Sequence, residues 1–272
     1  MSVGRIKNLV IAALIMINLF LLLFFVWGRA GEISARREVI EDICVIMGNN
    51  GIVLEPSSIG GAGGLASRGT SRDAAAEDAA AAAVLGNCEK TESGSISRYL
   101  GARGSASFNG RGEFVFEIYP GDAAAESAEA HARGLIKDMG LRTGAPDIKR
   151  SDGVTSVSAV CTFEGAPVFN CPVRFEYEDG SLIRVSGRRA YAARDAAGES
   201  ISGAADALLS FLAYVKGEGA PCGEITQVEA GYQFNVSAAG DGELSPGWRV
   251  DTDQGEFFVY SSGAVERVGA AY

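Results

Sequence analysis

The side chains best suited to nucleophilic, acid–base or metal chemistry are one histidine and five cysteines. The histidine is His131, and the cysteines are Cys44, Cys88, Cys161, Cys171 and Cys222. The sequence contains no CxxC pair and no second histidine, so the usual spacing of zinc ligands is absent. A cysteine–histidine nucleophile would need His131 beside one of the thiols, and the spacing favours none of them. These residues therefore predict neither a metal site nor a thiol enzyme.

Other catalytic signatures are also missing. No Gly-x-Ser-x-Gly elbow and no His-Glu-x-x-His motif occurs in the sequence. The Gly60–Gly64 run fits no GxGxxG register and is not followed by Gly-Lys-Ser/Thr, so it does not predict a phosphate-binding loop. Carboxylate pairs such as Asp251 and Asp253 alternate with apolar residues, which is typical of a solvated surface. We predict a non-enzyme without catalytic, cofactor-binding or metal-binding residues.

Cys161 and Cys171 are the one pair of thiols expected to lie close together. Residues 154–163 and 168–177 alternate between apolar and other side chains, and a turn at Gly165–Pro167 would join them as a hairpin. This turn would place Cys161 opposite Cys171. A disulfide bond and two small buried side chains both fit that placement. The odd number of cysteines argues against a fully oxidised set.

The elements that would position these residues form two similar groups. In the first group, strands at 97–108 and 113–119 precede a helix at 122–139. In the second, strands at 154–163, 168–177 and 182–187 precede a helix at 202–216, and four further strands follow. Each group is an antiparallel meander covered by a helix, so the predicted class is α+β. We expect a first domain over 49–150, with a Gly/Ala-rich loop at 57–72, and a second over 151–272.

The N-terminal segment carries a membrane signal. Leu9–Trp27 contains Asn18 as its only polar side chain. At about 1.5 Å per residue, such a helix nearly spans a hydrocarbon core of roughly 30 Å. A cleaved signal peptide is the alternative, although its apolar region is usually about 7–15 residues and ends at small residues. Trp27 instead suits a membrane–water boundary. We predict an uncleaved transmembrane helix over 9–27 and an amphipathic stalk over 28–48.

Charge sets the expected topology and excludes one class of partner. Residues 1–8, which include Arg5 and Lys7, form a short N-terminus that stays easily in the cytoplasm, so the body is expected to be extracytoplasmic. All 34 acidic residues follow residue 31, and the formal net charge is −10. Such a body is repelled by nucleic acid. The predicted location is the cell membrane, with a single pass and no nucleic-acid partner.

A polar side chain near mid-membrane suggests a contact with another helix. Asn18 is costly in hydrocarbon unless its amide is hydrogen-bonded, and an interhelical hydrogen bond is one solution. Ala12 and Ala13 provide small residues for close approach of a partner helix. A bond from Asn18 to its own backbone is the equal alternative.

The opening and the C-terminal part carry a family resemblance. Arg5-Ile6-Lys7 runs directly into an apolar segment that contains Asn18–Leu22. The C-terminal part has Gly231-Tyr232, a Phe/Tyr-rich strand and two short motifs. These are a Pro-x-Trp-x-Val strand made by Pro246, Trp248 and Val250, and a closing Gly-x-Val that begins at Gly263. Together they resemble the YycH/YycI family, membrane-anchored regulators of an essential envelope histidine kinase in Gram-positive bacteria.

The resemblance implies a function and partners. It implies a non-catalytic, single-pass regulator that acts through transmembrane and extracytoplasmic contacts with a sensor histidine kinase and a YycH-like paralogue. The Pro-x-Trp-x-Val strand and the closing Gly-x-Val are also similar to PepSY-like domains. The alternative function is therefore a PepSY-type extracytoplasmic protease inhibitor or peptide-binding module.

Overall fold

The computed structural model describes residues 16–18, 20, 37–61, 64–119, 121, 127–190, 192–219, 221–237 and 242–268. The chain divides into two compact units, Met1–Pro56 and Ser57–Tyr272. Most of the expected transmembrane segment Leu9–Trp27, including Ala12 and Ala13, lies outside the described residues. Asn18 is described and belongs to a short helical stretch at 16–18. In the described part of the chain, no helix has both the length and the apolarity needed to cross a bilayer.

The N-terminal unit contains one longer described helix, over residues 37–49, and the short strand β1 (Val53–Leu54). The helix coincides with the later part of the expected stalk, whose earlier residues 28–36 lie outside the described residues. At its end, the Ile52 amide donates to the Met47 carbonyl at 3.0 Å, and Gly51 has a φ of 78°. The helix thus ends within the Gly-Asn-rich sequence that follows Met47, where Gly51 adopts the left-handed backbone common after helices.

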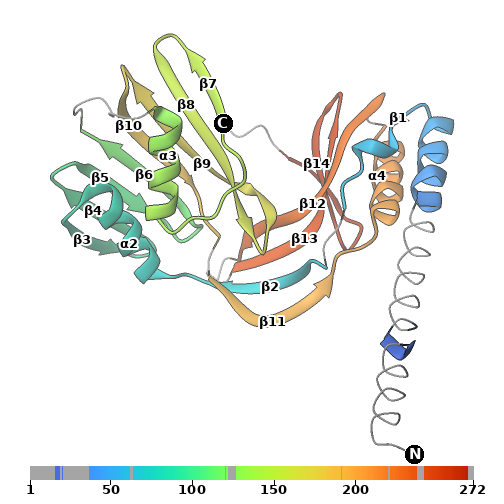
Figure 1. Ribbon diagram of the computed structural model, residues 1–272, viewed down its shortest axis with the longest axis horizontal. Coiled ribbons are helices and arrows are strands. Elements are labelled where there is room, and N and C mark those ends of the chain that lie inside the picture. Colours follow the sequence, from blue (N-terminus) through green and yellow to red (C-terminus); the bar gives the residue numbers. More distant parts are fainter. Residues whose placement is uncertain are drawn as a thin grey trace, which may run out of the picture. The chain divides into compact units, whose positions relative to one another are not determined.

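The unit Ser57–Tyr272 is dominated by antiparallel strands (Figure 1). Neighbouring strands follow the order β11-β2-β13-β12-β9-β10-β6-β5-β4-β3. In addition, β8 pairs with β9 and β7 with β8, while β14 pairs with β13 and β15 with β14. The α+β class expected from the sequence is confirmed at this level: a sheet-rich fold with few helices.

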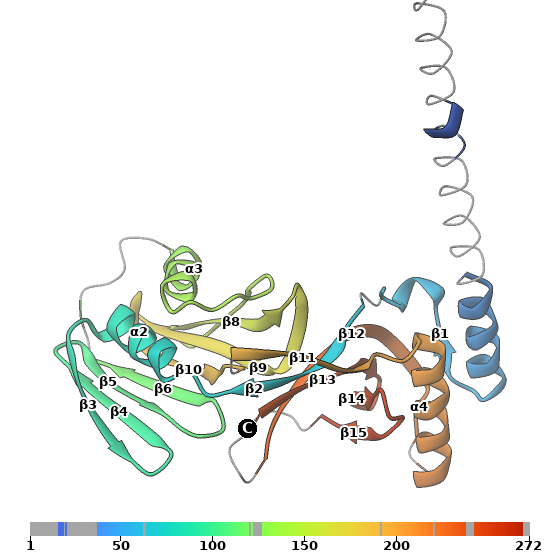
Figure 2. The same cartoon turned by 90° about the horizontal axis from the view of Figure 1, so that it is seen from below.

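The first part of this unit packs two helices on one face of its strands (Figure 2). The helices are α2 (Ala74–Leu85) and α3 (Ala128–Asp138). The strands are β3 (Cys88–Ser93), β4 (Ile96–Gly101), β5 (Gly104–Phe108), β6 (Glu113–Ile118), β7 (Asp147–Ser151), β8 (Val154–Phe163), β9 (Ala166–Glu178) and β10 (Ser181–Arg188). One face of these strands is apolar because their side chains alternate, and the helices bury that face.

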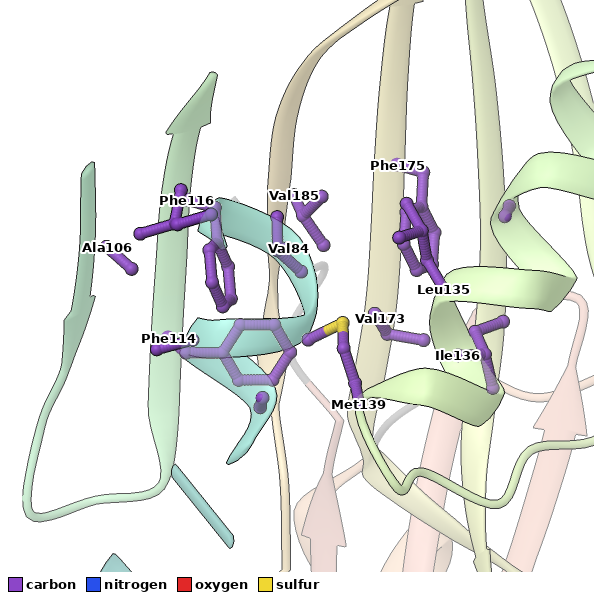
Figure 3. Close-up of a cluster of buried hydrophobic side chains, with 14 of the residues drawn as sticks. Val84, Ala106, Phe114, Phe116, Leu135, Ile136, Met139, Val173, Phe175 and Val185 are labelled. Carbon is purple, nitrogen blue, oxygen red and sulfur yellow. The ribbon is translucent and has the colours of Figure 1, made fainter. Parts of the chain in front are cut away.

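Figure 3 shows the core that results. Phe114 and Phe116 of β6 and Phe175 of β9 are fully buried, and Leu135 and Ile136 of α3 pack into the same cluster. Burying a side chain of this size contributes about 1.5–3 kcal/mol relative to leaving it exposed. This core therefore fixes α3, whose C-terminal end lines a surface pocket described below.

The second part of the unit carries one helix, α4 (Ala204–Glu218), against a second group of strands. These strands are β2 (Ala66–Ser71), β11 (Ala192–Ser200), β12 (Glu224–Val236), β13 (Gly242–Thr252), β14 (Gly255–Tyr260) and β15 (Val265–Arg267). Phe211 of α4 packs on Phe257 of β14, with ring centres 5.2 Å apart. The two parts of the unit are joined where β9 runs parallel to β12, at Val168 and Tyr232.

The expected loop at 57–72 is wrong in its second half. Pro56–Ser58 forms a single turn of 3₁₀ helix, and Ala66–Ser71 forms β2. The sequence of this strand shows no apolar alternation. The strand is held instead by backbone pairing with β13 on one side and β11 on the other. Arg68 pairs with Leu244, and such non-local pairing leaves no local sequence signal.

Hydrogen bonding also crosses residue 150, where we expected a boundary between two domains. β10 pairs with β6, with Val185 opposite Phe116, so strands from both expected domains build one sheet. The buried cluster around Phe116 includes residues from Ala80 to Val185. The sequence contains two similar groups of strands followed by a helix. In the structure, strands of both groups pack into one sheet instead of forming two separate domains.

Candidate interaction face of the C-terminal sheet

Three of the predicted motif residues, Pro246, Trp248 and Val250, are alternate residues of β13 and are buried. Trp248 is 1% exposed, and its Nε1 donates to the Ser202 carbonyl at 3.0 Å. Val250 pairs with Phe257, which packs on α4, so this face of β13 points into the core. Trp248 and Val250 therefore face the core. The motif residues thus pack the buried face of β13, and the other face of this strand is free to carry a site.

Gly263, the fourth motif residue, occupies the turn between β14 and β15. It has a φ of 85°, and its amide donates to the Tyr260 carbonyl at 2.9 Å. A Cβ at this position would lie 3.2 Å from the Ser210 hydroxyl of α4. Glycine is needed here because the turn requires a left-handed backbone beside a packed helix. Gly263 therefore has a structural role.

The opposite face of the same strands carries charged and aromatic side chains. We call it the candidate face, formed by the partly exposed Phe169, Glu229, Arg249, Asp251 and Tyr260 together with Phe258, which is buried beneath them. The Arg249 guanidinium lies 3.1 Å from Glu229 Oε2 and 3.1 Å from Asp251 Oδ1. Its carbon Cζ lies 4.7 Å from the centre of the Phe169 ring, within cation–π range. Arg249 thus connects two acidic residues to an aromatic side chain from a different part of the sheet.

Two paired glycines make room for the aromatic rings of this face. Gly231 of β12 pairs with Gly247 of β13. A Cβ on Gly231 would lie 2.5 Å from Cε2 of Phe169, and one on Gly247 would lie 2.6 Å from Cε1 of Phe258. Real side chains cannot approach so closely, so the rings occupy the space that two side chains would otherwise fill.

A hydrogen-bonded group continues the candidate face along β14. The Tyr260 hydroxyl donates to Glu266 Oε2 at 2.7 Å and also contacts Gln233 Oε1. Burial, together with the Glu266 carboxylate, raises the pKa of Tyr260 above its ordinary value. Tyr260 is therefore a neutral hydrogen-bonding group at physiological pH, which fits recognition better than proton transfer.

The carboxylate of Asp251 has an unusual environment within this face. Burial raises the pKa of Asp251, and the Arg249 charge offsets part of that rise. Asp251 is 22% exposed in its side chain, and Arg249 is 21% exposed. A half-buried ion pair of this kind costs desolvation energy and requires both partners. The candidate face presents charge, aromatic surface and hydrogen-bonding groups, and it contains neither a thiol nor an imidazole.

The histidine and the cysteines lie outside the candidate face. His131 on α3 has its Nδ1 3.2 Å from the Tyr177 hydroxyl, and its ring meets Tyr177 edge-on. The described contacts of His131 do not join it to a cysteine. In the ranges that the structure describes, no three His, Cys, Asp or Glu side chains are grouped to hold a metal ion.

Cys161 and Cys171 are both buried and both have free thiols. Their hairpin turns at Glu164-Gly165, with Phe163 opposite Ala166, so the expected turn at Gly165–Pro167 is wrong. The register shifts between Val160 and Thr162, which places Cys161 at an irregularity of β8. Burial raises the pKa of Cys161 to about 11 and that of Cys171 further still. These shifts suppress the thiolate and so oppose a nucleophilic role.

The sequence alone does not reveal the candidate face. Strand alternation marks Arg249 only as a polar residue between Trp248 and Val250, and Phe169 only as part of a hairpin. Glycines inside the apolar strands at Gly231 and Gly247 are the available signal, because glycine in a strand often marks a close approach. Their partner rings cannot be assigned without the contact between β9 and β12.

The comparisons with known proteins concern the fold. No protein-family model and no curated protein matches the sequence. Among solved structures, an uncharacterized protein from Eubacterium rectale matches with a TM-score of 0.52 and 10% identity, covering 75% of this chain and 86% of that one. The C-terminal domain of Bacillus megaterium YpeB matches with a TM-score of 0.36 and 14% identity, covering 74% of this chain and 99% of that one. The Eubacterium structure is similar to this chain in fold alone, and the resemblance to the YycH/YycI family stays a prediction.

Proposed function

We propose that this chain is a non-catalytic, single-pass membrane regulator of an envelope sensor histidine kinase, with its body outside the cytoplasm. Support for the anchor comes from the apolar segment Leu9–Trp27, and support for the class comes from the opening and the Pro246–Val250 strand. The proposed partners are the kinase and a YycH-like paralogue. No catalytic step is assigned to the chain.

The observation that carries this proposal is the candidate face. Arginine and aromatic side chains are enriched at protein interfaces, and Arg249 lies on the ring of Phe169 there. The sheet beneath is rigid because Trp248 and Val250 are buried on its other side. A rigid surface with charge and aromatic area supports protein recognition.

A charge reversal on this face tests the proposal. Glu256 is exposed and pairs with Asp251 across β13 and β14, so Glu256→Lys changes the charge of the face and gives Asp251 a new partner. Co-purification of the kinase from membranes should fall about tenfold, equivalent to roughly 1.4 kcal/mol. Glu218→Lys at the exposed end of α4 is the matched control and should bind as wild type. If wild type, Glu256→Lys and Glu218→Lys all bind the kinase equally, the candidate face does not bind the kinase.

The transmembrane contact needs its own test. Asn18→Leu should leave membrane insertion intact, since leucine is better solvated by lipid, and should weaken kinase association by about 1 kcal/mol. Leu14→Ala serves as a packing control within the same segment. If Asn18→Leu binds the kinase as tightly as wild type, the segment Leu9–Trp27 serves only as an anchor. Protease added to protoplasts should digest the body, and a protected body would contradict the proposed topology.

The second candidate is a PepSY-type inhibitor or peptide-binding module. The observation that favours it is the Pro246, Trp248 and Val250 strand at the centre of a helix-backed antiparallel sheet. This function predicts that the purified full-length protein inhibits an envelope protease or binds peptides in the absence of the kinase. Kinase co-purification without protease inhibition would favour the first proposal.

A further inference from the structure

A pocket of about 670 Å³ lies at the C-terminal end of α3. Residues 140–146 form one side of it, and Arg133, Ile136 and Lys137 of α3 form the other. Arg142 lies in the loop and lines the pocket together with Lys137. The pocket is separate from the candidate face, since the two share no residue.

The backbone fixes the shape of this pocket. Gly140 has a φ of 68°, its amide donates to the Lys137 carbonyl at 3.0 Å, and the Leu141 amide donates to the Ile136 carbonyl at 2.9 Å. This pair of hydrogen bonds is the Schellman motif that ends many helices. The loop is then tied to β8, because the Gly144 amide donates to Val160 and the Thr162 amide donates to Arg142, at 2.9 and 2.7 Å. Backbone hydrogen bonds therefore hold the loop that lines the pocket.

The pocket carries positive charge in a strongly acidic protein. Three of its lining residues are cationic and none is acidic, although the chain has a net charge of −10. Arg133 is paired with Glu129 at 2.5 Å. For Lys137 and Arg142, the described residues provide no ion-pair partner. Two exposed cations thus face the pocket without a nearby carboxylate from its lining.

The helix dipole explains only part of this charge. A cation in the last turn of a helix interacts favourably with its C-terminal carbonyls, and Lys137 fills that position in α3. Lys216 fills the same position in α4. The end of α3 adds Arg142, which lies beyond the helix on a loop held by β8. A second cation at this point is not required by the helix.

We propose that this pocket binds a phosphate-bearing anion through Lys137 and Arg142. Lysine provides a point charge and arginine provides a bidentate donor for phosphate oxygens. Leu141 adds apolar surface for the carbon skeleton that carries the phosphate. The two cations offset the partial negative charge at the C-terminus of α3 and leave positive charge for a phosphate oxygen. The inference rests on the pocket alone and does not depend on the proposed regulatory function.

Titrations of the full-length protein in uncharged detergent test the proposal with two probes. Inorganic diphosphate represents a free phosphate source, and short-chain phosphatidylglycerol below its micelle concentration represents a lipid headgroup. Binding of either probe, followed by ³¹P NMR or calorimetry, supports the phosphate site and identifies its source. Lys137→Gln and Arg142→Gln should each raise the dissociation constant about tenfold.

Lys216→Gln is the matched control, because it removes an equal charge from the last turn of another helix. It should change the dissociation constant less than twofold, and thermal melts should show that all three variants remain folded. Absence of binding by both probes would overturn the proposal. An equal loss of affinity in Lys216→Gln would also overturn it, since the effect would then come from net charge.

Discussion

The Arg249 guanidinium carbon lies 4.7 Å from the centre of the Phe169 ring, although the two residues belong to strands on opposite sides of α4 in the sequence. The contact is possible because β9 runs beside β12, and β12 runs beside β13. It joins the hairpin β8–β9 to the C-terminal strands through two side chains.

A double-mutant cycle should measure this contact. Arg249→Met and Phe169→Leu should each destabilise the protein, and their coupling free energy should be about 0.5–2 kcal/mol in urea unfolding. Arg98 is exposed on β4, and a cycle between Arg98→Met and Phe169→Leu should be additive within about 0.5 kcal/mol. Additivity in both cycles would mean that the ring and the guanidinium do not interact in solution.

Gly231→Ala should destabilise the protein by about 1–3 kcal/mol, because its Cβ would lie 2.5 Å from Phe169 and 2.6 Å from the Pro167 carbonyl. Gly134→Ala is the control, since a Cβ there meets nothing within 4 Å and the residue lies inside α3. That change should stabilise the protein by about 0.5–1 kcal/mol. Thermal or urea unfolding compares the two, and equal signs would contradict the close approach.

Trp248→Ala should cost about 3–5 kcal/mol of unfolding free energy, as large-to-small changes in a packed core do. Trp248 is 1% exposed, whereas Leu209 on α4 is 44% exposed. Leu209→Ala should therefore cost much less in the same urea titration. A near-neutral Trp248→Ala would show that the indole does not pack in the core and would make it a candidate binding residue.

The pH dependence of stability should reflect the raised pKa of Asp251. Burial raises the pKa of Asp251, so the folded protein holds this proton more tightly than the unfolded chain. Its stabilising contribution is complete below the unfolded pKa of about 3.9 and is lost as pH rises through the folded pKa. The unfolding free energy of wild type minus that of Asp251→Asn should thus fall as the pH rises above about 4.

Asp253 is the control, because its pKa is shifted in the opposite direction. A hydrogen bond from Gln254 and others from the backbone amides of Gly223 and Glu224 lower the pKa of Asp253. Its contribution is present above the unfolded pKa of about 3.9 and is lost as pH falls through the folded pKa. The difference between wild type and Asp253→Asn should therefore rise as the pH increases toward about 4. Slopes of the same sign for the two variants would contradict the assigned environments.

Cysteine labelling should separate buried from accessible thiols. Cys161 and Cys171 are buried with raised pKa values, whereas Cys88 is partly exposed. Iodoacetamide on the native protein should modify the partly exposed Cys44, Cys88 and Cys222 before Cys161 and Cys171, as peptide mass spectrometry can measure. After denaturation without reductant, both Cys161 and Cys171 should react. If neither reacts until a reductant is added, the two form a disulfide in the isolated protein.

Hairpins with strong turn residues could be predicted from the sequence. Asp152-Gly153 and Asp179-Gly180 have positive φ at both positions, as two-residue turns between antiparallel strands require. The strands around Asp179-Gly180 were expected at 168–177 and 182–187, within a few residues of β9 and β10. The strand before Asp152-Gly153, β7, has no apolar alternation and was not expected. The helix expected over 202–216 also followed its sequence pattern and is α4.

Elements held by distant partners could not be predicted in this way. The stretch predicted as one strand at 97–108 is divided into β4 and β5 by a turn at Ala102-Arg103. Residues 192–200 form β11 through backbone pairing with β2, with register shifts and no apolar alternation. For the candidate face, the core side of β13 could be predicted from alternation, but Phe169 arrives from β9 through a non-local contact.

The pairing of β2 has a consequence for how the protein is made. Residue 68 pairs with residue 244, so a strand synthesised early waits for one of the last. Contacts between distant residues slow folding, because a long loop must close before they form. A ribosome-bound or partly exported chain that ends before β13 leaves that side of β2 unpaired, and an unpaired strand edge can associate with other chains. Biogenesis of this protein should therefore depend on chaperone protection until its C-terminal strands have emerged.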